Sequence, residues 1–254
     1  MENQNLTIAI SGSTGFIGTN FRKFLTTQNI PIICLSRKKQ KHSKLEKNIV
    51  FSDLNNVSKL NCDALVHLIG TGTQTKDADY ELVNVEQTQK IINLCKKSKI
   101  KKIVYISGLG VNNFTTFGYF ISKLKAEQLI IKSGLDYTIL RASYIVGNDD
   151  PLTQNLSKQI KIGVVLIPES GSYRLQPISV DDVCRVILAC VVNKKLSNKI
   201  IDLVGPKTIT FENYVKKFTK GKKIKIKKIP LEQAYFDALN HPKNAIYEIG
   251  RAHV

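Results

Sequence analysis

Tyr119 and Lys123 stand four residues apart in the segment GYFISK. Residues at this spacing share one face of a helix. A lysine ammonium beside a phenol favours the phenolate, which suits the tyrosine to proton transfer near neutral pH. The chain has nine tyrosines and 32 lysines, so roughly one such spacing is expected by chance. The surrounding sequence must therefore decide whether the pair belongs to a site.

A glycine-rich segment, SGSTGFIGTNFRKFL, follows the apolar run LTIAI near the start of the chain. Its three glycines have the spacing G-x-x-G-x-x-G between a predicted strand and a predicted helix. Such glycines permit a tight turn, let backbone approach a pyrophosphate and allow close helix packing. The N-terminus of the helix supplies free N–H groups and a positive dipole end. The segment predicts a dinucleotide site formed by Gly12, Thr14, Gly15, Phe16, Ile17 and Gly18.

The second predicted strand ends in CLSRKKQ, where Ser36 is followed by Arg37 and Lys38. A carboxylate at this position would accept hydrogen bonds from the ribose 2′-hydroxyl of NAD. Here that acceptor is missing and cations are supplied, which favours a 2′-phosphate. We therefore expect NADP(H) in preference to NAD(H). NAD(H) stays open, because a solvated basic run would have the same sequence.

Short apolar runs alternate with amphipathic stretches through the first half of the chain, which is typical of a parallel α/β sheet. The runs are apolar without interruption, so both faces of the sheet should be covered. We expect a doubly wound Rossmann domain over residues 1–148. Its strands should cover residues 6–10, 29–35, 48–51, 64–70, 101–107 and 136–140, and its helices residues 16–28, 80–97 and 119–132.

After residue 148 the alternation loosens, and we expect a smaller C-terminal lobe over residues 149–254. Some of its strands should return to the main sheet or pack on it, and the lobe should close a cleft over the cofactor. Ser179 and Asp182 match a capping pattern at a helix start. The predicted helices are residues 152–163, 180–193 and 211–218, and the predicted strands are 164–168, 199–205 and the alternating edge strand KIKIKKI.

The net charge of +18 has two explanations, a phosphate-rich partner or dispersed lysines on solvated faces. Lysine outnumbers arginine 32 to 6, whereas base recognition relies on arginine forks. We therefore expect no specific nucleic-acid recognition. A small-molecule substrate is the expected partner.

The remaining composition indicates an ordinary globular protein, with 43% hydrophobic and 23% charged residues. No apolar run approaches the roughly 20 residues that span a bilayer. The N-terminus has no signal-peptide pattern, so we expect a cytoplasmic protein. Five scattered cysteines and four distant histidines predict no metal site.

Together these motifs resemble the short-chain dehydrogenase/reductase superfamily, in its extended and atypical branches. Further segments match in the expected order over about residues 6–205. They include VFSDLNN, LVHLIG, YELVNVEQT, KIVYISGLG, GLDYTILRASYIVG and YRLQPISVDDV. The resemblance implies additional cofactor contacts at Asp53 and Leu54 near the adenine, at Leu68, Ile69 and Gly70 under the dinucleotide, and at Asn84.

The resemblance also implies roles for Tyr119 and Lys123. Tyr119 would exchange a proton with a substrate hydroxyl or carbonyl, and Lys123 would bind the nicotinamide ribose. The usual serine or threonine partner aligns with Gly108, which leaves Ser107, just before it, as the catalytic candidate. The interval from Ser107 to Tyr119 is short for a nucleotide-sugar epimerase.

Two residues are candidates for substrate contact. Tyr144 lies near the position where those epimerases have an asparagine that contacts the sugar nucleotide. Arg174 precedes Asp181 by seven residues, as does an arginine that holds a phosphate in such enzymes. An arginine that neutralises a carboxylate of the lobe would fit this position equally well.

These expectations favour an NADP(H)-dependent oxidoreductase or epimerase/dehydratase-like enzyme. Its substrate would be a small carbonyl or hydroxyl compound, with nucleotide-sugars as one class. The short interval before Tyr119 is closer to atypical members, which include NmrA-like regulators and the dinucleotide-binding accessory subunit of respiratory complex I. The alternative is therefore a non-catalytic NADP(H)-binding redox sensor or assembly module with a protein partner. A homodimer is also compatible with the sequence.

Overall fold

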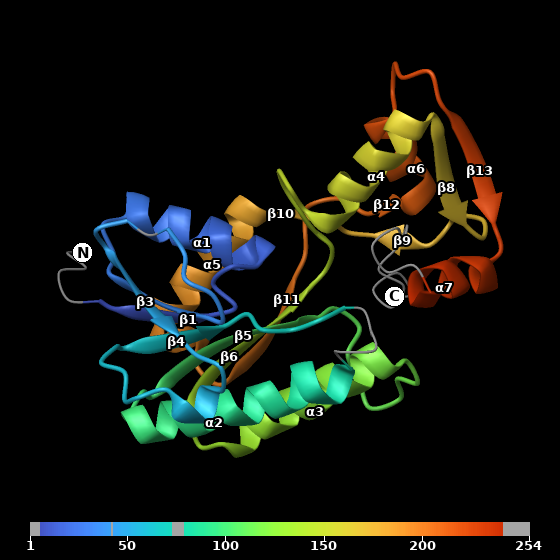
Figure 1. Cartoon of the computed structure of the whole chain (residues 1–254). Coiled ribbons are helices and arrows are strands. Elements are labelled where there is room, and N and C mark those ends of the chain that lie inside the picture. The colour runs from blue at the N-terminus through green and yellow to red at the C-terminus, as the bar shows by residue number, and fades with distance from the viewer. Residues whose placement is uncertain (1–5, 42, 73–78, 241–254) are drawn as a thin grey trace.

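Seven parallel strands form the central sheet of the computed structural model, which describes residues 6–41, 43–72 and 79–240. The chain starts in the middle of this sheet and builds outward in both directions, so the order reverses between β1 and β4 (Figure 1). This is the expected doubly wound arrangement. In spatial order the strands are β11 (Lys199–Leu203), β6 (Asp136–Ala142), β5 (Lys102–Gly108), β4 (Ala64–His67), β1 (Ile8–Ser11), β2 (Ile32–Ser36) and β3 (Glu46–Val50).

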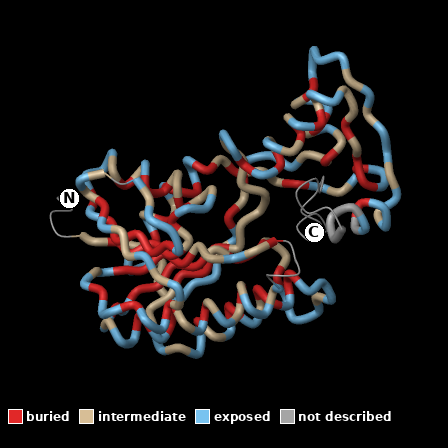
Figure 2. The backbone as a smooth tube through the Cα atoms, in the orientation of Figure 1, coloured by how far each residue is buried: buried red, intermediate tan, exposed pale blue. Residues whose placement is uncertain are grey.

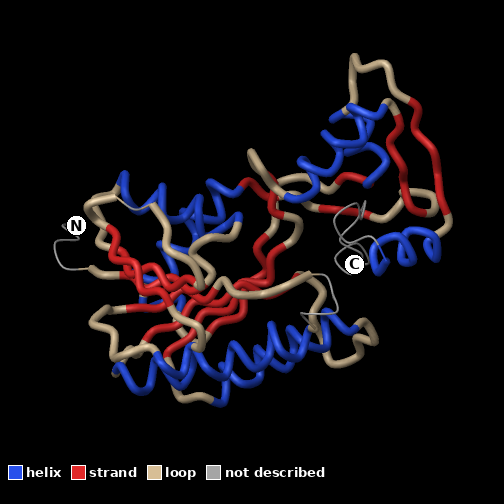
Figure 3. The backbone as a smooth tube through the Cα atoms, viewed as in Figure 1, coloured by secondary structure: helices blue, strands red, loops and turns tan. Residues whose placement is uncertain are grey.

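Two helical layers cover the sheet, as Figure 3 shows. α1 (Phe16–Thr27) and α5 (Val180–Val192) pack on one face, and α2 (Gln87–Ser98) and α3 (Gly118–Lys132) pack on the other. Alternate strand residues divide between two apolar cores, with Ile8 and Ile10 on the α1 side and Ala9 on the α2 side. Burial on both faces explains the uninterrupted apolar runs, and Figure 2 shows the buried residues concentrated in these strands.

Most expected elements differ from the observed ones by a few residues at their ends, and two of these differences lie next to the cavity. The strand expected over residues 64–70 ends at His67, level with the end of its neighbour β1 at Ser11, and the amide of Leu68 makes the last hydrogen bond to that strand. The helix expected over residues 80–97 begins with a π-helix, Glu81–Glu86, before α2. π-helical turns are rare and frequent at functional sites.

The C-terminal lobe lies beyond the carboxyl ends of the central strands (Figure 1). Paired short strands β7 (Ile145–Val146) and β10 (Ile178–Ser179) connect it to the sheet. α5 and β11 return to the Rossmann domain, where β11 pairs with β6. Residues 241–254 of the expected lobe lie outside the described residues. The lobe itself contains α4 (Pro151–Ile162), β8 (Val164–Pro168), β9 (Arg174–Leu175), β12 (Ile209–Thr210), α6 (Phe211–Phe218), β13 (Lys225–Ile229) and α7 (Leu231–Asn240).

Local signals fix the start of several helices. Ser179 accepts a hydrogen bond from the amide of Asp182, which confirms the expected cap of α5. Asp150 caps α4 in the same way, through the amide of Thr153. Among the described residues no helix is both long enough and apolar enough to cross a membrane.

A buried arginine ties the glycine-rich turn to the basic loop after β2. Arg22 of α1 makes a bidentate ion pair with Glu46, in which Nε donates to Oε1 and Nη2 donates to Oε2, both at 2.8 Å. Its guanidinium also donates to the carbonyls of Ser13 and Lys41. The pKa of Arg22 is raised, chiefly by the hydrogen bond to Glu46. The pair therefore connects α1, the glycine-rich turn, Lys41 in the loop after β2, and β3.

Replacing Glu46 with alanine should be strongly destabilising, because it leaves the Arg22 guanidinium buried without its carboxylate. We expect a loss of about 3 kcal/mol in the free energy of unfolding, measured by urea denaturation. Glu81→Ala is the matched control, since its ion pair with Lys125 has side chains 54% and 51% exposed and should contribute little. Equal losses in the two variants would contradict the role assigned to Glu46.

Candidate functional site

The glycine-rich turn has the close packing that a dinucleotide site requires. Gly12 has φ +70°, and a Cβ there would lie 2.7–2.8 Å from backbone atoms of Leu68 and Ile69. A Cβ at Gly18 would collide with the backbone of the turn itself. Only glycine fits both positions. β1, α1 and the end of β4 are thereby drawn together at the switch point of the sheet.

The N-terminus of α1 is open toward the same place. Gly15 occupies the cap position, and no described side chain bonds to the first amides of the helix. Thr14 and Gly15 are exposed at the tip of the turn, and Phe16 and Ile17 begin the helix. Uncapped amides and the helix dipole suit a phosphate group. The residues present therefore fit the pyrophosphate of a dinucleotide.

The end of β2 presents cations to solvent. The Ser36 hydroxyl is buried and donates to the carbonyl of Lys38 at 2.6 Å, which shapes a tight turn. Arg37 and Lys38 are exposed beyond this turn. Since the Ser36 proton is used within the chain, the chemistry offered to a ligand here is that of the exposed cations.

Asp53 and Leu54 form the start of a short 3₁₀ turn, Leu54–Asn56. The Asp53 carboxylate accepts from the amide of Asn55 at 2.9 Å and from Lys90 at 3.1 Å. These contacts lower the pKa of Asp53, the Asn55 amide contributing most. Leu54 is buried in the core beneath the turn. Asp53 thus holds the 3₁₀ turn in place and ties it to α2 through Lys90.

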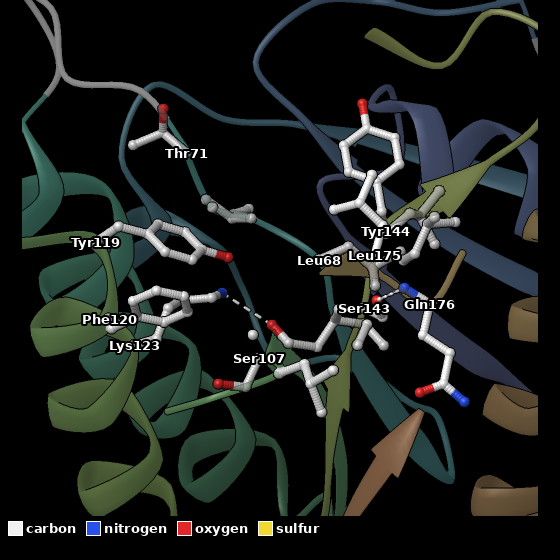
Figure 4. A pocket seen from close by; sticks show the side chains of 18 of the residues that line it. Leu68, Thr71, Ser107, Tyr119, Phe120, Lys123, Ser143, Tyr144, Leu175 and Gln176 are labelled. Carbon is white, nitrogen blue, oxygen red and sulfur yellow. Dashed lines mark hydrogen bonds between the residues drawn. The ribbon is translucent and has the colours of Figure 1, made fainter. Parts of the chain in front are cut away.

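A cavity of about 220 Å³ lies between the carboxyl ends of the strands and the lobe. Figure 4 shows the Tyr119 hydroxyl directed into it, with the Lys123 ammonium close by. Both residues come from the first turns of α3 and are buried. The lining includes Ile17, Leu68, Ile69, Gly70, Thr71, Ser107, Gly108, Tyr119, Lys123, Ser143, Tyr144, Arg174, Gln176 and Thr208.

Lys123 is fixed from beneath the cavity. Its ammonium donates to the hydroxyl of Tyr105 and to the carbonyl of Ile106, both at 2.8 Å. Tyr105 is fully buried, and burial raises its pKa well above the ordinary value. Tyr105 is therefore a neutral acceptor that positions the Lys123 ammonium without neutralising its charge.

His67 continues this buried network. Its ring stacks on Tyr105 at 5.3 Å, and its nitrogens contact Ser11 at 2.7 Å and Thr88 at 2.9 Å. Thr88 gives its own proton to the carbonyl of Asn84, so it accepts from Nε2 of His67. Nδ1 is then the acceptor for Ser11. His67 is neutral, and both of its ring nitrogens are hydrogen-bonded. Burial lowers the pKa of His67 to about 3, and the positive charge of nearby Lys123 contributes less to the same shift.

Asn84 links the segment after β4 to α3 by hydrogen bonds. Its carbonyl oxygen accepts from the amide of Thr71 at 2.8 Å, and its amide donates to the Thr71 carbonyl and to Ser122 of α3. The side chain is fully buried in the π-helix. Its hydrogen-bonding groups serve the fold, so Asn84 positions Gly70 and Thr71 next to α3.

Ser107 and Gly108 have different surroundings. Ser107 lies on the same side of β5 as Ile103 and Tyr105, and its buried hydroxyl has no partner among the described residues. In Figure 4 this hydroxyl points away from that of Tyr119. A Cβ at Gly108, by contrast, would lie 3.4 Å from the Tyr119 hydroxyl. Gly108 occupies the position that faces the phenol.

Polar groups of the lobe and of the segment between β6 and β7 line the wall of the cavity opposite α3. Arg174 on β9 is exposed and makes no ion pair among the described residues. Tyr144 accepts from the amide of Leu152 through its hydroxyl. Ser143 accepts from the amide of Gln176 at 3.3 Å, so its proton can be donated into the cavity. The sequence had not suggested Ser143, Gln176 or Tyr105 as site residues.

The chain matches the family described as NAD(P)H-binding over residues 12–194. The chain belongs to the NAD(P)H-binding family. Among curated relatives, the mitochondrial 40 kDa subunit of NADH-ubiquinone oxidoreductase from Neurospora crassa is 22% identical over 80% of this chain. An uncharacterised sugar epimerase, YhfK of Bacillus subtilis, is 25% identical over 56% of this chain. The alignments span 57% and 63% of those two relatives' own lengths.

The fold of this family member is also that of solved epimerase-like structures. MoeE5, solved in complex with UDP-glucuronic acid and NAD, has a TM-score of 0.75 and 16% identity, covering 94% of this chain and 92% of that one. The expected relationship to epimerase-like and complex I subunit-like dehydrogenases is confirmed by these relatives. Residues 12–194 thus form an NAD(P)H-binding domain.

The buried, neutral state of His67 predicts an acid-sensitive fold. Its ordinary pKa is 6.5 and its folded pKa about 3, so between these values only the unfolded state binds the proton. This stabilisation is complete above about pH 6.5 and is lost as the pH falls toward 3. Going from about pH 7 to about pH 5 should cost about 2 kcal/mol through this group.

Urea denaturation at the two pH values tests this prediction. In His67→Gln, whose amide can still donate to Thr88, the loss between the two pH values should be smaller by that amount. The comparison uses the change with pH, so a general destabilisation of the variant does not affect it. An identical change in both proteins would contradict a neutral, buried His67.

Proposed function

We propose that the protein is an NADP(H)-dependent oxidoreductase or epimerase/dehydratase-like enzyme acting on a small carbonyl or hydroxyl substrate. The observation that carries this proposal is a cavity that both Tyr119 and Lys123 line. The end of β4 at the switch point and polar groups of the lobe line the same cavity. A bound nicotinamide would supply or accept the hydride.

The protein's own residues would handle the proton. Tyr119 gives a proton to the substrate oxygen or removes one from it. The ammonium of Lys123, held by Tyr105 and the Ile106 carbonyl, keeps a positive charge near the phenol and favours its ionised form. With Gly108 at the position that faces Tyr119, the hydroxyl of Ser143, directly after β6, is the group that donates to the substrate oxygen from the opposite wall. Ser107, whose hydroxyl points away, would serve the fold.

The lobe side of the cavity suits an anionic substrate such as a nucleotide-sugar. Arg174 lines the cavity with a guanidinium that pairs with no carboxylate among the described residues. Guanidinium groups bind phosphates through two parallel hydrogen bonds. The similarity to MoeE5, which was solved with a UDP-sugar, supports the same class.

A second function, an NADP(H)-binding assembly or redox-sensing module without turnover, is favoured by Gly108. A family member that lacks a hydroxyl at this position keeps the cofactor crevice but loses one polarising group of the site. The relationship to a subunit of NADH-ubiquinone oxidoreductase supports this alternative. In that case the lobe would contact a protein partner.

Cofactor choice is tested by thermal shift with NADP(H) and NAD(H) side by side. NADP(H) should raise the melting temperature more at equal concentration, since its 2′-phosphate can bind Arg37 and Lys38. At 100 times the dissociation constant the stabilisation is about 2.7 kcal/mol. The double change Ser36→Asp with Arg37→Ala should reverse the preference. A stronger effect of NAD(H) on the unmodified protein would refute the NADP(H) assignment, and no effect of either would refute both proposed functions.

Catalysis is tested by Tyr119→Phe in a turnover assay with a panel of UDP-sugars and small carbonyl compounds. The variant should lose about 10²- to 10⁴-fold in turnover while its cofactor affinity stays unchanged. Ser143→Ala should lower turnover too, and Ser107→Ala should not. Tyr137→Phe, outside the cavity, is the matched control. Full turnover in Tyr119→Phe would contradict the catalytic role proposed for Tyr119. Cofactor binding without turnover in the unmodified protein would favour the non-catalytic module.

A further inference from the structure

Positive charge is concentrated in two segments of the lobe that are far apart in the sequence. Residues 151–168 and 213–230 contain ten lysines and no aspartate or glutamate. They account for more than half of the net charge of +18 in about one seventh of the chain. Dispersed lysines on an ordinary solvated surface would not give this distribution.

The fold brings these segments together at one end of the lobe. β13 pairs in parallel with β8, with Lys225 opposite Val164, and the amide of Lys225 bonds to the carbonyl of Gly163 at 2.9 Å. The end of α4 and the turn between α6 and β13 therefore meet. Figure 1 shows this region at the top of the lobe, and Figure 2 shows the turn as exposed. The lobe tip, as we define it, comprises Lys158, Lys161, Ile162, Lys217, Lys220, Lys222, Lys223 and Lys225.

The charge of the lobe tip is not neutralised within the described chain. Glu212 pairs with Lys216 at 3.2 Å and Lys228 at 3.7 Å, both outside the tip. The seven lysines of the tip are exposed, and none of them makes an ion pair among the described residues. The tip is therefore a patch of positive charge only. Such a patch stabilises the fold less than a surface of mixed charge would, because its lysines repel one another.

An apolar side chain lies within this patch. Ile162, the last residue of α4, is 77% exposed. It precedes Gly163, which ends the helix in the left-handed conformation and bonds to Lys225. The lobe tip thus combines exposed lysines with an exposed aliphatic side chain. Such a surface can contact a negatively charged layer and an apolar layer at the same time.

We propose that the lobe tip binds the surface of an anionic phospholipid bilayer. The lysines would contact headgroup phosphates as point charges, and Ile162 would enter the boundary between headgroups and acyl chains. Nucleic acid fits less well, because the tip has no arginine to grip bases. Its aromatic neighbour Phe218 is half-buried, with the Lys222 ammonium 5.0 Å above its ring, so it is not free to stack on a base.

This binding is separate from the cofactor site. None of the described residues that line the cavity belongs to the lobe tip. The protein would hold its cofactor crevice away from the lipid while the tip is bound, since Figure 1 shows the turn between α6 and β13 at the end of the lobe remote from the central sheet. Membrane attachment can therefore be lost without loss of cofactor binding, and the two can be measured independently.

Vesicle co-sedimentation of the full chain tests the proposal. The protein should bind phosphatidylcholine vesicles containing roughly 30% phosphatidylglycerol, should not bind pure phosphatidylcholine, and should be released at about 0.5 M salt. Each lysine near such a surface contributes roughly fivefold in affinity, so Lys220→Gln, Lys222→Gln and Lys223→Gln together should weaken binding about a hundredfold. Ile162→Ser should weaken it about tenfold.

The matched control removes the same charge elsewhere. Lys96→Gln, Lys99→Gln and Lys101→Gln together change three exposed lysines of the Rossmann domain and should change vesicle affinity about twofold at most. Thermal stabilisation by NADP(H) should be the same in both triple variants, which separates this test from that of the proposed function. Absence of binding to anionic vesicles, or equal weakening in the two triple variants, would overturn the proposal. So would tip-dependent binding of a single-stranded oligonucleotide without vesicle binding.

Discussion

The close approach of the Gly12 backbone to that of Leu68 and Ile69 is the constraint on which the rest of the site depends. It lets the first turn of the chain reach the end of β4, and it aims the uncapped start of α1 into the crevice at the switch point. A side chain at Gly12 would push β1 and β4 apart at that point. The crevice then opens toward the lobe, whose β9 and following residues provide its outer wall. This one backbone contact thus sets how the glycine-rich turn lies relative to the cavity that Leu68 and Ile69 line.

A buried polar network below the cavity fixes the second half of the site. Ser11, which directly precedes Gly12, bonds to His67, and His67 bonds to Thr88 and stacks on Tyr105. Tyr105 in turn accepts from Lys123. The network therefore links the glycine-rich turn to Lys123, which lines the cavity. Because its members are buried and satisfied, it fixes one geometry for Lys123 and needs no bound ligand to do so.

Periodicity along the chain predicted most of the fold, since strands buried on both faces and amphipathic helices leave a strong apolar pattern. The segments FENYVKKF and VVLIP matched α6 and β8 residue for residue. The two-residue strands β7, β9, β10 and β12 were not predicted, because a bridge of that length has no period. α7 was also missed. The glycine-rich turn and the Tyr119–Lys123 pair were found because their spacing is itself the signal.

Other site residues left no such signal. His67 and Tyr105 lie inside apolar runs and resemble core residues until the structure shows their hydrogen bonds. Ser143 gains its orientation from the amide of Gln176, 33 residues later, which no local pattern records. The exposed position of Ile162 among lysines is likewise visible only when two distant segments are seen to meet.

The most direct measurement of the central claim is a crystal structure of the protein grown with NADPH. The account predicts pyrophosphate density against the Gly12–Gly15 turn and the N-terminus of α1, the 2′-phosphate beside Arg37 and Lys38, and the nicotinamide in the cavity next to Lys123 and Tyr119. Density for the cofactor elsewhere on the surface, or a cavity that stays empty at saturating NADPH, would contradict it.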